Sequence, residues 1–238
     1  MNERNTISLD GEDQPVAVIA FGGNALLRPQ DHGTQEEQFT LAWKATRWLV
    51  EIIHRGYELA IVHGNGPQVG NIMIQVEEAF TKIPPQSLDV AVAQTQGSMG
   101  YMLANQMRNR LNEEQLDRDI AAVLTQVVVD REDPAFENPS KPVGPYYTAY
   151  RANLLMQEAG WEMVEEPGRG WRKVVASPKP HRILGSRLLK RLIEDRAIVV
   201  AGGGGGIPVY EDVGGYYRGV EAVIDKDYVA SILATDLN

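Results

Sequence analysis

Three short apolar stretches that each end in glycine constrain the fold more than any other feature of this chain. Residues 16–21, 59–62 and 197–201 have the length and apolar character of buried strands. The turns that follow them are Gly22-Gly23-Asn24, Gly64-Asn65-Gly66-Pro67 and the glycine run 202–206. Apolar residues at helical spacing cover 35–54, and Pro67 suits the first turn of a second helix. This alternation of strands and helices predicts a parallel sheet in an α/β fold.

The rest of the chain continues this pattern, with one interruption. A buried strand is predicted over 120–129, and helices over 87–111, over 185–195 and from Lys226 onward. Between these elements the sequence becomes rich in proline and aromatic residues and shows a helical period only around 147–160. We therefore predict a flexible tail at 1–14, a core at 15–130 and 181–238, and an inserted subdomain at 131–180.

Net charge and the lengths of the apolar runs argue against nucleic acid and membranes as partners. The 238 residues carry a formal net charge of −9, whereas a nucleic-acid groove needs a basic stripe. The apolar runs are shorter than the roughly 18–20 residues that a membrane span needs, and residues 1–14 lack the apolar centre of a secretory signal. The absence of cysteine excludes a disulfide framework and a thiol nucleophile. We expect a cytoplasmic protein that binds small molecules, with no nucleic-acid or membrane partner.

Glycines at the ends of parallel strands are suited to holding a phosphoryl group. The first two glycine turns are expected at the same edge of the sheet, where ligands bind in open α/β folds. Glycine lets backbone N–H groups approach a phosphate closely, and the helix that follows directs its positive end there. The alternative is that these glycines serve backbone shape alone. The run 202–206 is interpreted as a close-fitting anion loop, with a flexible linker as the alternative.

Two lysines are candidates for neutralising phosphoryl charge. Lys141 lies among prolines that would stiffen its segment and fix its direction. Lys226 lies between Asp225 and Asp227, so it is either part of a solvated charge cluster or a group oriented for phosphoryl transfer. His63 has no acidic or hydroxyl partner at useful spacing, which predicts a hydrogen-bonded structural role.

A further basic segment allows two interpretations. It reads Gly168-Arg169-Gly170-Trp171-Arg172-Lys173. Its cations either bind an anion or stack on Trp171 at the surface.

Seven motifs together resemble one family. In chain order they are Phe21-Gly22-Gly23-Asn24-Ala25, His63-Gly64-Asn65-Gly66-Pro67-Gln68-Val69-Gly70, Gln94-Thr95-Gln96-Gly97-Ser98, Leu124-Thr125-Gln126-Val127-Val128-Val129-Asp130, the segment 168–173, Ser177-Pro178-Lys179-Pro180 and Val223-Ile224-Asp225-Lys226-Asp227. In this order and spacing the sequence resembles the carbamate kinases of the amino-acid-kinase superfamily over residues 16–235. The resemblance implies an αβα sandwich around a mainly parallel open sheet, with a protruding subdomain where the insert is predicted.

The resemblance also implies a reaction and a set of site residues. The reaction is reversible phosphoryl transfer between carbamoyl phosphate and ADP, giving carbamate and ATP, with Mg²⁺ bound to the nucleotide. By resemblance, the residues expected to contact the phosphoryl and carbamate groups are Gly22, Gly23, Asn24, Asn65 and Gly66. The anion-loop interpretation of the glycine run adds Gly203, Gly204 and Gly205 as phosphate-binding residues. Lys141 would reach in from the insert, Lys226 would bridge the donor and acceptor phosphates, and Asp227 would orient the lysines. No metal ligands are assigned in the protein, and a homodimer is expected.

The chain departs from the family's pattern at its end. Members of the family continue for several more strands and helices beyond the segment that ends here at Asn238. We therefore expect poorer nucleotide binding, and we expect Val229, Ile232 and Leu233 of the last helix to lack the strands they would cover. The alternative to an active kinase is a catalytically impaired fragment that keeps only the phosphate-binding cradle.

Overall fold

The described part of the protein is built on a parallel four-stranded sheet. The computed structural model describes residues 14–22, 26–27 and 31–237. The strands of the sheet lie in the order β1 (Val16–Phe21), β2 (Glu58–His63), β9 (Ile198–Val200) and β3 (Ile120–Ala122). All neighbouring pairs are parallel. The carboxyl ends of these strands therefore meet at one edge of the sheet, as the sequence predicts.

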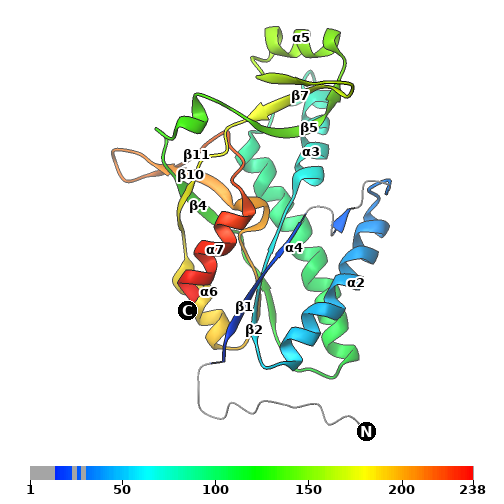
Figure 1. Ribbon diagram of the computed structural model, residues 1–238, viewed down its shortest axis with the longest axis vertical. Coiled ribbons are helices and arrows are strands. Elements are labelled where there is room, and N and C mark those ends of the chain that lie inside the picture. The colour runs from blue at the N-terminus through cyan, green and yellow to red at the C-terminus, as the bar shows by residue number, and fades with distance from the viewer. Residues whose placement is uncertain (1–13, 23–25, 28–30, 238) are drawn as a thin grey trace.

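Two long helices cover one face of this sheet (Figure 1). Helix α2 (Gln35–His54) begins with a capping box in which Thr34 and Glu37 bond each other's backbone N–H groups, and α4 (Leu88–Glu113) lies beside it. Their apolar sides meet the sheet in a core that includes Leu49, Ile61 and Met99. Burial of this continuous apolar surface is the main term that stabilises the layer.

Two shorter helices cover the opposite face, which completes the expected αβα sandwich (Figure 1). Helices α6 (Ser186–Glu194) and α7 (Lys226–Leu237) pack on Ala60, Val62 and Val199 of the sheet. The expectation that the last helix would leave its apolar residues uncovered is wrong for this chain. Val229 and Leu233 are fully buried, and Ile232 packs against the same core. The reason is that α7 packs against β1 and β2 of the first sheet.

A second sheet continues the core. Its order is β11 (Tyr217–Gly219), β10 (Ile207–Glu211), β4 (Gln126–Val129) and β8 (Pro180–Ile183). Strands β4 and β10 are parallel, and the two outer strands run antiparallel to them. This sheet is mixed, so the fold is mainly rather than wholly parallel.

The single strand predicted over 120–129 is wrong, because the chain changes sheets within it. Strand β3 ends at Ala122 in the first sheet, and β4 begins at Gln126 in the second. Between them the Thr125 hydroxyl donates to the Val123 carbonyl at 2.8 Å, and the Thr125 N–H donates to Gln96 Oε1 at 2.8 Å. These bonds satisfy the backbone where it leaves the ladder.

The remaining strands form a small protruding subdomain, seen at the top of Figure 1. It contains β5 (Lys141–Tyr147), α5 (Ala149–Glu158), β6 (Met163–Glu166) and β7 (Gly170–Val175), with the antiparallel order β5-β7-β6. Ala152, Leu155 and Met163 form its own small core. The chain enters it through the short helix η1 (Pro134–Phe136) and returns to the second sheet in β8. The boundaries 131 and 180 stay predictions.

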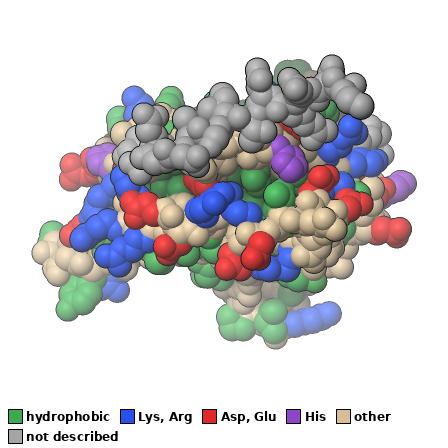
Figure 2. All heavy atoms as spheres, turned by 90° about the horizontal axis from the view of Figure 1, so that it is seen from below, with side chains coloured by type: hydrophobic (Ala, Val, Ile, Leu, Met, Phe, Trp, Pro, Cys, Tyr) green, Lys and Arg blue, Asp and Glu red, His purple; other side chains and the backbone are tan. Residues whose placement is uncertain are grey.

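The amino-terminal ends of the first sheet's strands carry a buried charge cluster. Glu58 opens β2 and pairs with Arg118, and both side chains are largely buried. Arg196 Nε lies 3.4 Å from Glu58 Oε1. Figure 2, which views the molecule from this end, shows acidic and basic side chains interspersed on the visible described surface. Across the part of the chain that the structure describes, no helix has the length and apolar character to cross a membrane.

Candidate functional site

The candidate cradle lies where β1, β2 and β9 end. Gly22 follows β1, and Asn65 and Gly66 lead from β2 into helix α3 (Gly66–Ala79), which has Pro67 in its first turn. Apart from the chain neighbours and the glycine's own helix, no atom of the described residues lies within 4 Å of where a Cβ would stand on Gly22 or Gly66, so both glycines border open space. The start of α3 therefore presents its N–H groups to an accessible region. Gly23 and Asn24 lie outside the described residues.

The glycine run packs tightly against the same turns. Its short helix η2 (Gly203–Gly205) is fully buried. A Cβ on Gly203 would overlap the His63 ring, one on Gly204 the Asn65 carboxamide, and one on Gly205 the Ile224 carbonyl. Gly204 also has a φ of +67°, which side chains rarely adopt. The flexible-linker alternative is therefore wrong. Close packing alone explains why glycine occupies these positions, whether or not an anion binds there. Phosphate contact by Gly203, Gly204 and Gly205 stays a prediction.

A polar clamp from α4 fixes these turns. Asn65 Nδ2 donates to Thr95 Oγ1 at 2.8 Å. Gln96 Nε2 donates to the Gly203 carbonyl at 2.9 Å while its Oε1 accepts the Thr125 N–H. The Thr125 hydroxyl in turn accepts the Gly202 N–H at 2.9 Å. Buried polar groups of this kind rigidify a site when all their bonds are made.

Sequence reasoning did not assign Thr95, Gln96 and Thr125 to the site, although two of the motifs contain them. The signal available in the sequence was the pair Thr95 and Gln96 on a predicted helix whose neighbouring positions include the apolar residues Ala91, Val92 and Met99. In the structure these apolar neighbours are buried. All three polar residues are buried in the structure.

His63 is held as a neutral structural residue. Its ring is buried, and Nδ1 lies 3.2 Å from the Gly64 carbonyl, to which it donates. Burial lowers the pKa of His63 to about 4. The imidazole therefore stays uncharged at neutral pH and supports the Gly203 backbone on which it packs.

Two aspartates bring the two candidate lysines to one place. Lys141 Nζ, from the first residue of β5, lies 3.2 Å from Asp225 Oδ2. Lys226 Nζ lies 2.8 Å from Asp227 Oδ1, and Asp225 Oδ1 accepts the Asp227 N–H at 2.9 Å. That N–H bond, with smaller help from Lys141, lowers the pKa of Asp225. Asp227 thus contacts Lys226, whereas Asp225, which sequence reasoning left out of the site, contacts Lys141.

Packing joins this charged cluster to the cradle. Ile224, whose carbonyl lies against Gly205, directly precedes Asp225. On the other side, the close approach of Gly70 in α3 to Gly144 in β5 holds the subdomain strand against the cradle's helix. Lys141, Lys226 and the glycine turns therefore border one region at the carboxyl edge of the sheet. The lysines are only partly exposed, at 36% and 23% of their side-chain surface, so their charges are screened less than free surface charges.

The basic segment 168–173 stacks on aromatic rings, but not on Trp171. Arg169 and Arg172 lie over the Tyr146 ring at 4.6 and 5.1 Å from its centroid. Lys173 lies over the Trp161 ring at 4.5 Å. Arg172 also donates to the Gly144 carbonyl at 3.0 Å. The arginines thus stiffen the subdomain, and Lys173 lines a cavity.

Comparison with known proteins identifies the family. Residues 15–238 match the model of the amino acid kinase family. A carbamate kinase from Pyrococcus horikoshii is 46% identical over 223 residues, which cover 93% of this chain and 71% of that protein. Carbamate kinase 1 from Enterococcus faecium is 47% identical over 218 residues, which cover 91% of this chain and 68% of that protein.

Solved structures give the same result. A carbamate kinase from Giardia lamblia bound to AMP-PNP superposes with a TM-score of 0.86 at 39% identity, covering 94% of this chain and 71% of that one. A crystal structure from Aeropyrum pernix K1 superposes with a TM-score of 0.90 at 40% identity, covering 94% and 72%. The chain therefore belongs to the amino acid kinase family, and within it to the carbamate kinases.

Proposed function

We propose that this chain transfers a phosphoryl group between carbamoyl phosphate and ADP at the carboxyl edge of its first sheet. The observation that carries the proposal is the Asp225–Asp227 cluster, which holds Lys141 and Lys226 beside the glycine turns. Phosphoryl transfer needs positioned positive charge more than a side-chain nucleophile. Two oriented ammonium groups next to accessible backbone N–H groups meet that need.

Each part of the site has a role in this reaction. In the direction of ATP synthesis, a β-phosphate oxygen of ADP forms a bond to phosphorus while the bond from phosphorus to the carbamate oxygen breaks. Lys226 bridges the donor and acceptor oxygens, with Asp227 fixing its ammonium. Lys141 reaches in from the subdomain and holds the carbamoyl phosphate. Backbone N–H groups at Gly22 and Gly66, together with Gly23, Asn24 and Asn65, contact the phosphoryl and carbamate groups, and Gly203, Gly204 and Gly205 line the cradle.

The nucleotide would bring the magnesium ion. Mg²⁺ usually keeps several waters and binds to phosphate oxygens with one or two carboxylates. Among the described residues no cluster of three or more His, Cys, Asp or Glu side chains is arranged to hold a metal ion. Asp227, whose side chain is 71% exposed, supplies a carboxylate beside Lys226 that fits such a phosphate-borne ion. When bound, Mg²⁺ would supply charge neutralisation at the phosphates.

We also propose a homodimer and a cytoplasmic location. Trp48 on α2 and Tyr101 on α4 are 69% and 63% exposed, and contact between two subunits would remove this aromatic surface from water. A chain without cysteine needs no oxidising compartment to form disulfides, which fits a cytoplasmic location. Light scattering coupled to gel filtration, on the wild-type chain and on a Trp48→Ser variant, tests the dimer.

Phosphorus NMR tests the reaction directly. The 238-residue chain is mixed with carbamoyl phosphate and MgADP, and the ATP resonances are followed against a sample without protein. We expect ATP to appear as carbamoyl phosphate disappears. With acetyl phosphate in its place we expect far slower transfer, because the motifs are those of carbamate kinases rather than kinases of other small carboxylates. Binding of both substrates without ATP formation would favour the impaired fragment that keeps only the cradle.

A further inference from the structure

A large cavity among the described residues is lined by none of the cradle glycines. It has a volume of about 720 Å³ and is bordered by the second half of α3, the α3–α4 loop, α5 and β7. The nearest α3 residue in its wall, Met73, stands seven residues after Gly66, which corresponds to about 10 Å along the helix axis. The cavity opens between the subdomain and the core, and its lining contains none of the residues assigned to the proposed reaction.

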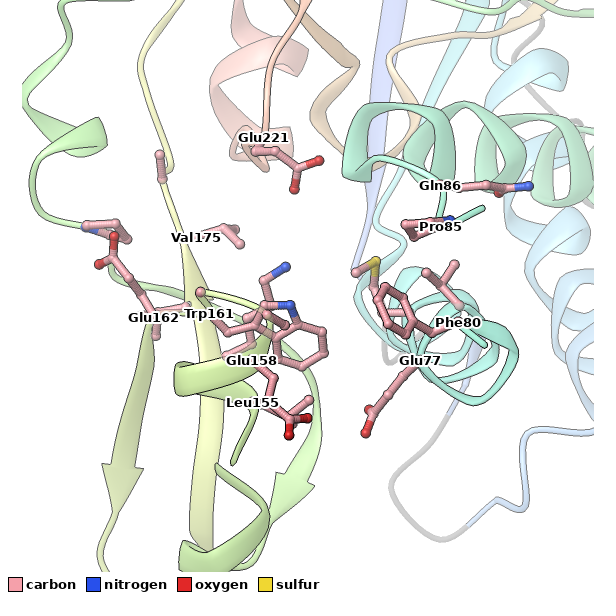
Figure 3. Close-up of a pocket in the computed structure, with 18 of the residues that line it drawn as sticks. Glu77, Phe80, Pro85, Gln86, Leu155, Glu158, Trp161, Glu162, Val175 and Glu221 are labelled. Carbon is pink, nitrogen blue, oxygen red and sulfur yellow. The ribbon is translucent and has the colours of Figure 1, made fainter. Parts of the chain in front are cut away.

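Apolar side chains face one another across this cavity. Figure 3 shows Trp161 and Leu155 on the subdomain side opposite Phe80 and Pro85 on the core side. Phe80 is 64% exposed, although its ring is large and apolar. Filling the space would remove this surface from water, which stabilises a complex in proportion to the apolar area covered. The cavity thus offers room and apolar contact for a side chain of a small ligand.

Lys173, a cation in the cavity lining, forms no ion pair with a described residue. Lys173 lies over the Trp161 ring, and no hydrogen bond or ion pair within 4 Å joins it to a residue that the structure describes. Burial lowers the pKa of Lys173, while the nearby Glu221 carboxylate opposes that shift. Arg151, the other cation in the wall, is already paired with Glu77. A half-buried, unpaired ammonium favours an incoming carboxylate.

The Glu221 carboxylate in the cavity lining uses only one of its two oxygens in a hydrogen bond to a described residue. Glu221 Oε1 accepts the Leu88 N–H at 2.7 Å at the start of α4, and in the described part of the chain its second oxygen has no partner. Figure 3 shows its carboxylate pointing into the gap. Glu158 also belongs to the lining, so a ligand with a net negative charge would be repelled. The charges favour a ligand that carries an anion for Lys173 and a cation for Glu221.

We propose that this cleft binds an α-amino acid with an apolar side chain. Its carboxylate pairs with Lys173, its ammonium pairs with Glu221, and its side chain lies between Trp161 and Phe80. The two charges of an α-amino acid are separated by a single carbon, so they suit two neighbouring protein charges of opposite sign that do not contact each other. Such a ligand would bridge the subdomain and the core.

Calorimetric titration of the full 238-residue chain with L-leucine and L-phenylalanine tests this site without any measurement of activity. Two analogues serve as probes on the unchanged protein: L-leucinamide lacks the carboxylate, and N-acetyl-L-leucine lacks the ammonium. We expect saturable binding of both amino acids, and at least tenfold weaker binding of each analogue. The proposal is overturned if neither amino acid binds below about 10 mM or if either analogue binds as tightly as leucine.

Variants assign the charges to residues. Lys173→Met and Glu221→Gln should each weaken leucine binding at least tenfold, and glutamine keeps the acceptor for the Leu88 N–H. Glu162→Gln is the matched control, because Figure 3 shows that side chain pointing away from the gap. Circular dichroism and thermal midpoints check folding. Equal affinity in Glu221→Gln and Glu162→Gln would overturn the proposal, and so would unchanged affinity in a folded Lys173→Met protein.

Discussion

Lys141 Nζ and Asp225 Oδ2 lie 3.2 Å apart although 84 residues separate them in the sequence. The lysine belongs to the protruding subdomain and the aspartate to the loop before α7, so this ion pair fastens the subdomain's first strand to the core. Asp225 also accepts the Asp227 N–H, so one carboxylate contacts both Lys141 and the residue that pairs with Lys226.

Asp225→Asn should therefore lower turnover without unfolding the protein. The amide keeps an acceptor for the Asp227 N–H but loses the charge that holds Lys141. We expect a decrease of kcat/KM for carbamoyl phosphate of about tenfold to 100-fold, which is what misplacing a catalytic group by about 1 Å costs. Asp130→Asn is the control, because Asp130 likewise accepts an N–H two residues along the chain, that of Glu132, at 2.9 Å. Equal rates for the two variants would show that Asp225 has no positioning role.

Lys141→Ala should weaken the use of carbamoyl phosphate more than the binding of ADP. The reason is that Lys141 enters the site from the subdomain, on the side we assign to carbamoyl phosphate. Titration calorimetry with each substrate separates the two effects. Loss of ADP affinity with unchanged carbamoyl phosphate affinity would place Lys141 on the other substrate.

Gly204→Ala should destabilise the fold sharply. A methyl group there would overlap the Asn65 carboxamide, which is fixed by its bond to Thr95, and a φ of +67° itself costs roughly 1–2 kcal/mol for a residue with a side chain. Gly215→Ala is the matched control, with a φ of +79° and no atom of the described residues beyond its chain neighbours within 4 Å of the new methyl. Denaturant unfolding should show a clearly larger loss at 204. If both variants lose the same stability, the packing of the glycine run is looser than described.

The free energy of unfolding should decrease at acidic pH because of His63. Its folded-state pKa of about 4 is below the ordinary value of 6.5, so between these pH values the unfolded chain binds a proton that the folded protein does not. The free energy of unfolding therefore does not depend on His63 titration above about pH 6.5. It decreases by about 3 kcal/mol in all as the pH falls toward 4.

Urea unfolding at several pH values, on wild type and on His63→Gln, measures this loss. The variant should show a shallower decrease than wild type across this range. His181→Gln, which replaces an exposed histidine, should keep the wild-type slope. Identical slopes in all three proteins would mean that His63 takes up its proton normally in the folded state.

Local patterns predicted the elements well where each element is set by its own residues. Helix α2 has the predicted bounds 35–54 because its apolar period and its stop signal are both local. Strand β1 matches for the same reason. The strand predicted over 120–129 failed because its division depends on Gln96, a residue of a distant helix. Periodicity carries no information about such a tertiary bond.

The position of the candidate site residues in the fold was predictable in part, and their roles stay predictions. The glycine turns and the two lysines follow from motifs, and the structure brings the described ones to one edge of the sheet. The pairing of Lys141 with Asp225 was not predictable, because nothing in the sequence near Lys141 indicates an aspartate 84 residues away. Asn65 shows a further difference, since its amide group is bonded to Thr95 within the protein.

The initial rate of ATP formation from carbamoyl phosphate and MgADP, compared between wild type and Lys226→Met, tests the central claim most directly. Methionine keeps an unbranched apolar chain at the start of α7 and removes only the ammonium that Asp227 orients. The site described here predicts that wild type forms ATP and that the variant, with an unchanged circular dichroism spectrum, is slower by about 100-fold or more. A folded Lys226→Met protein that forms ATP at the wild-type rate, or a wild-type chain that forms none, would contradict it.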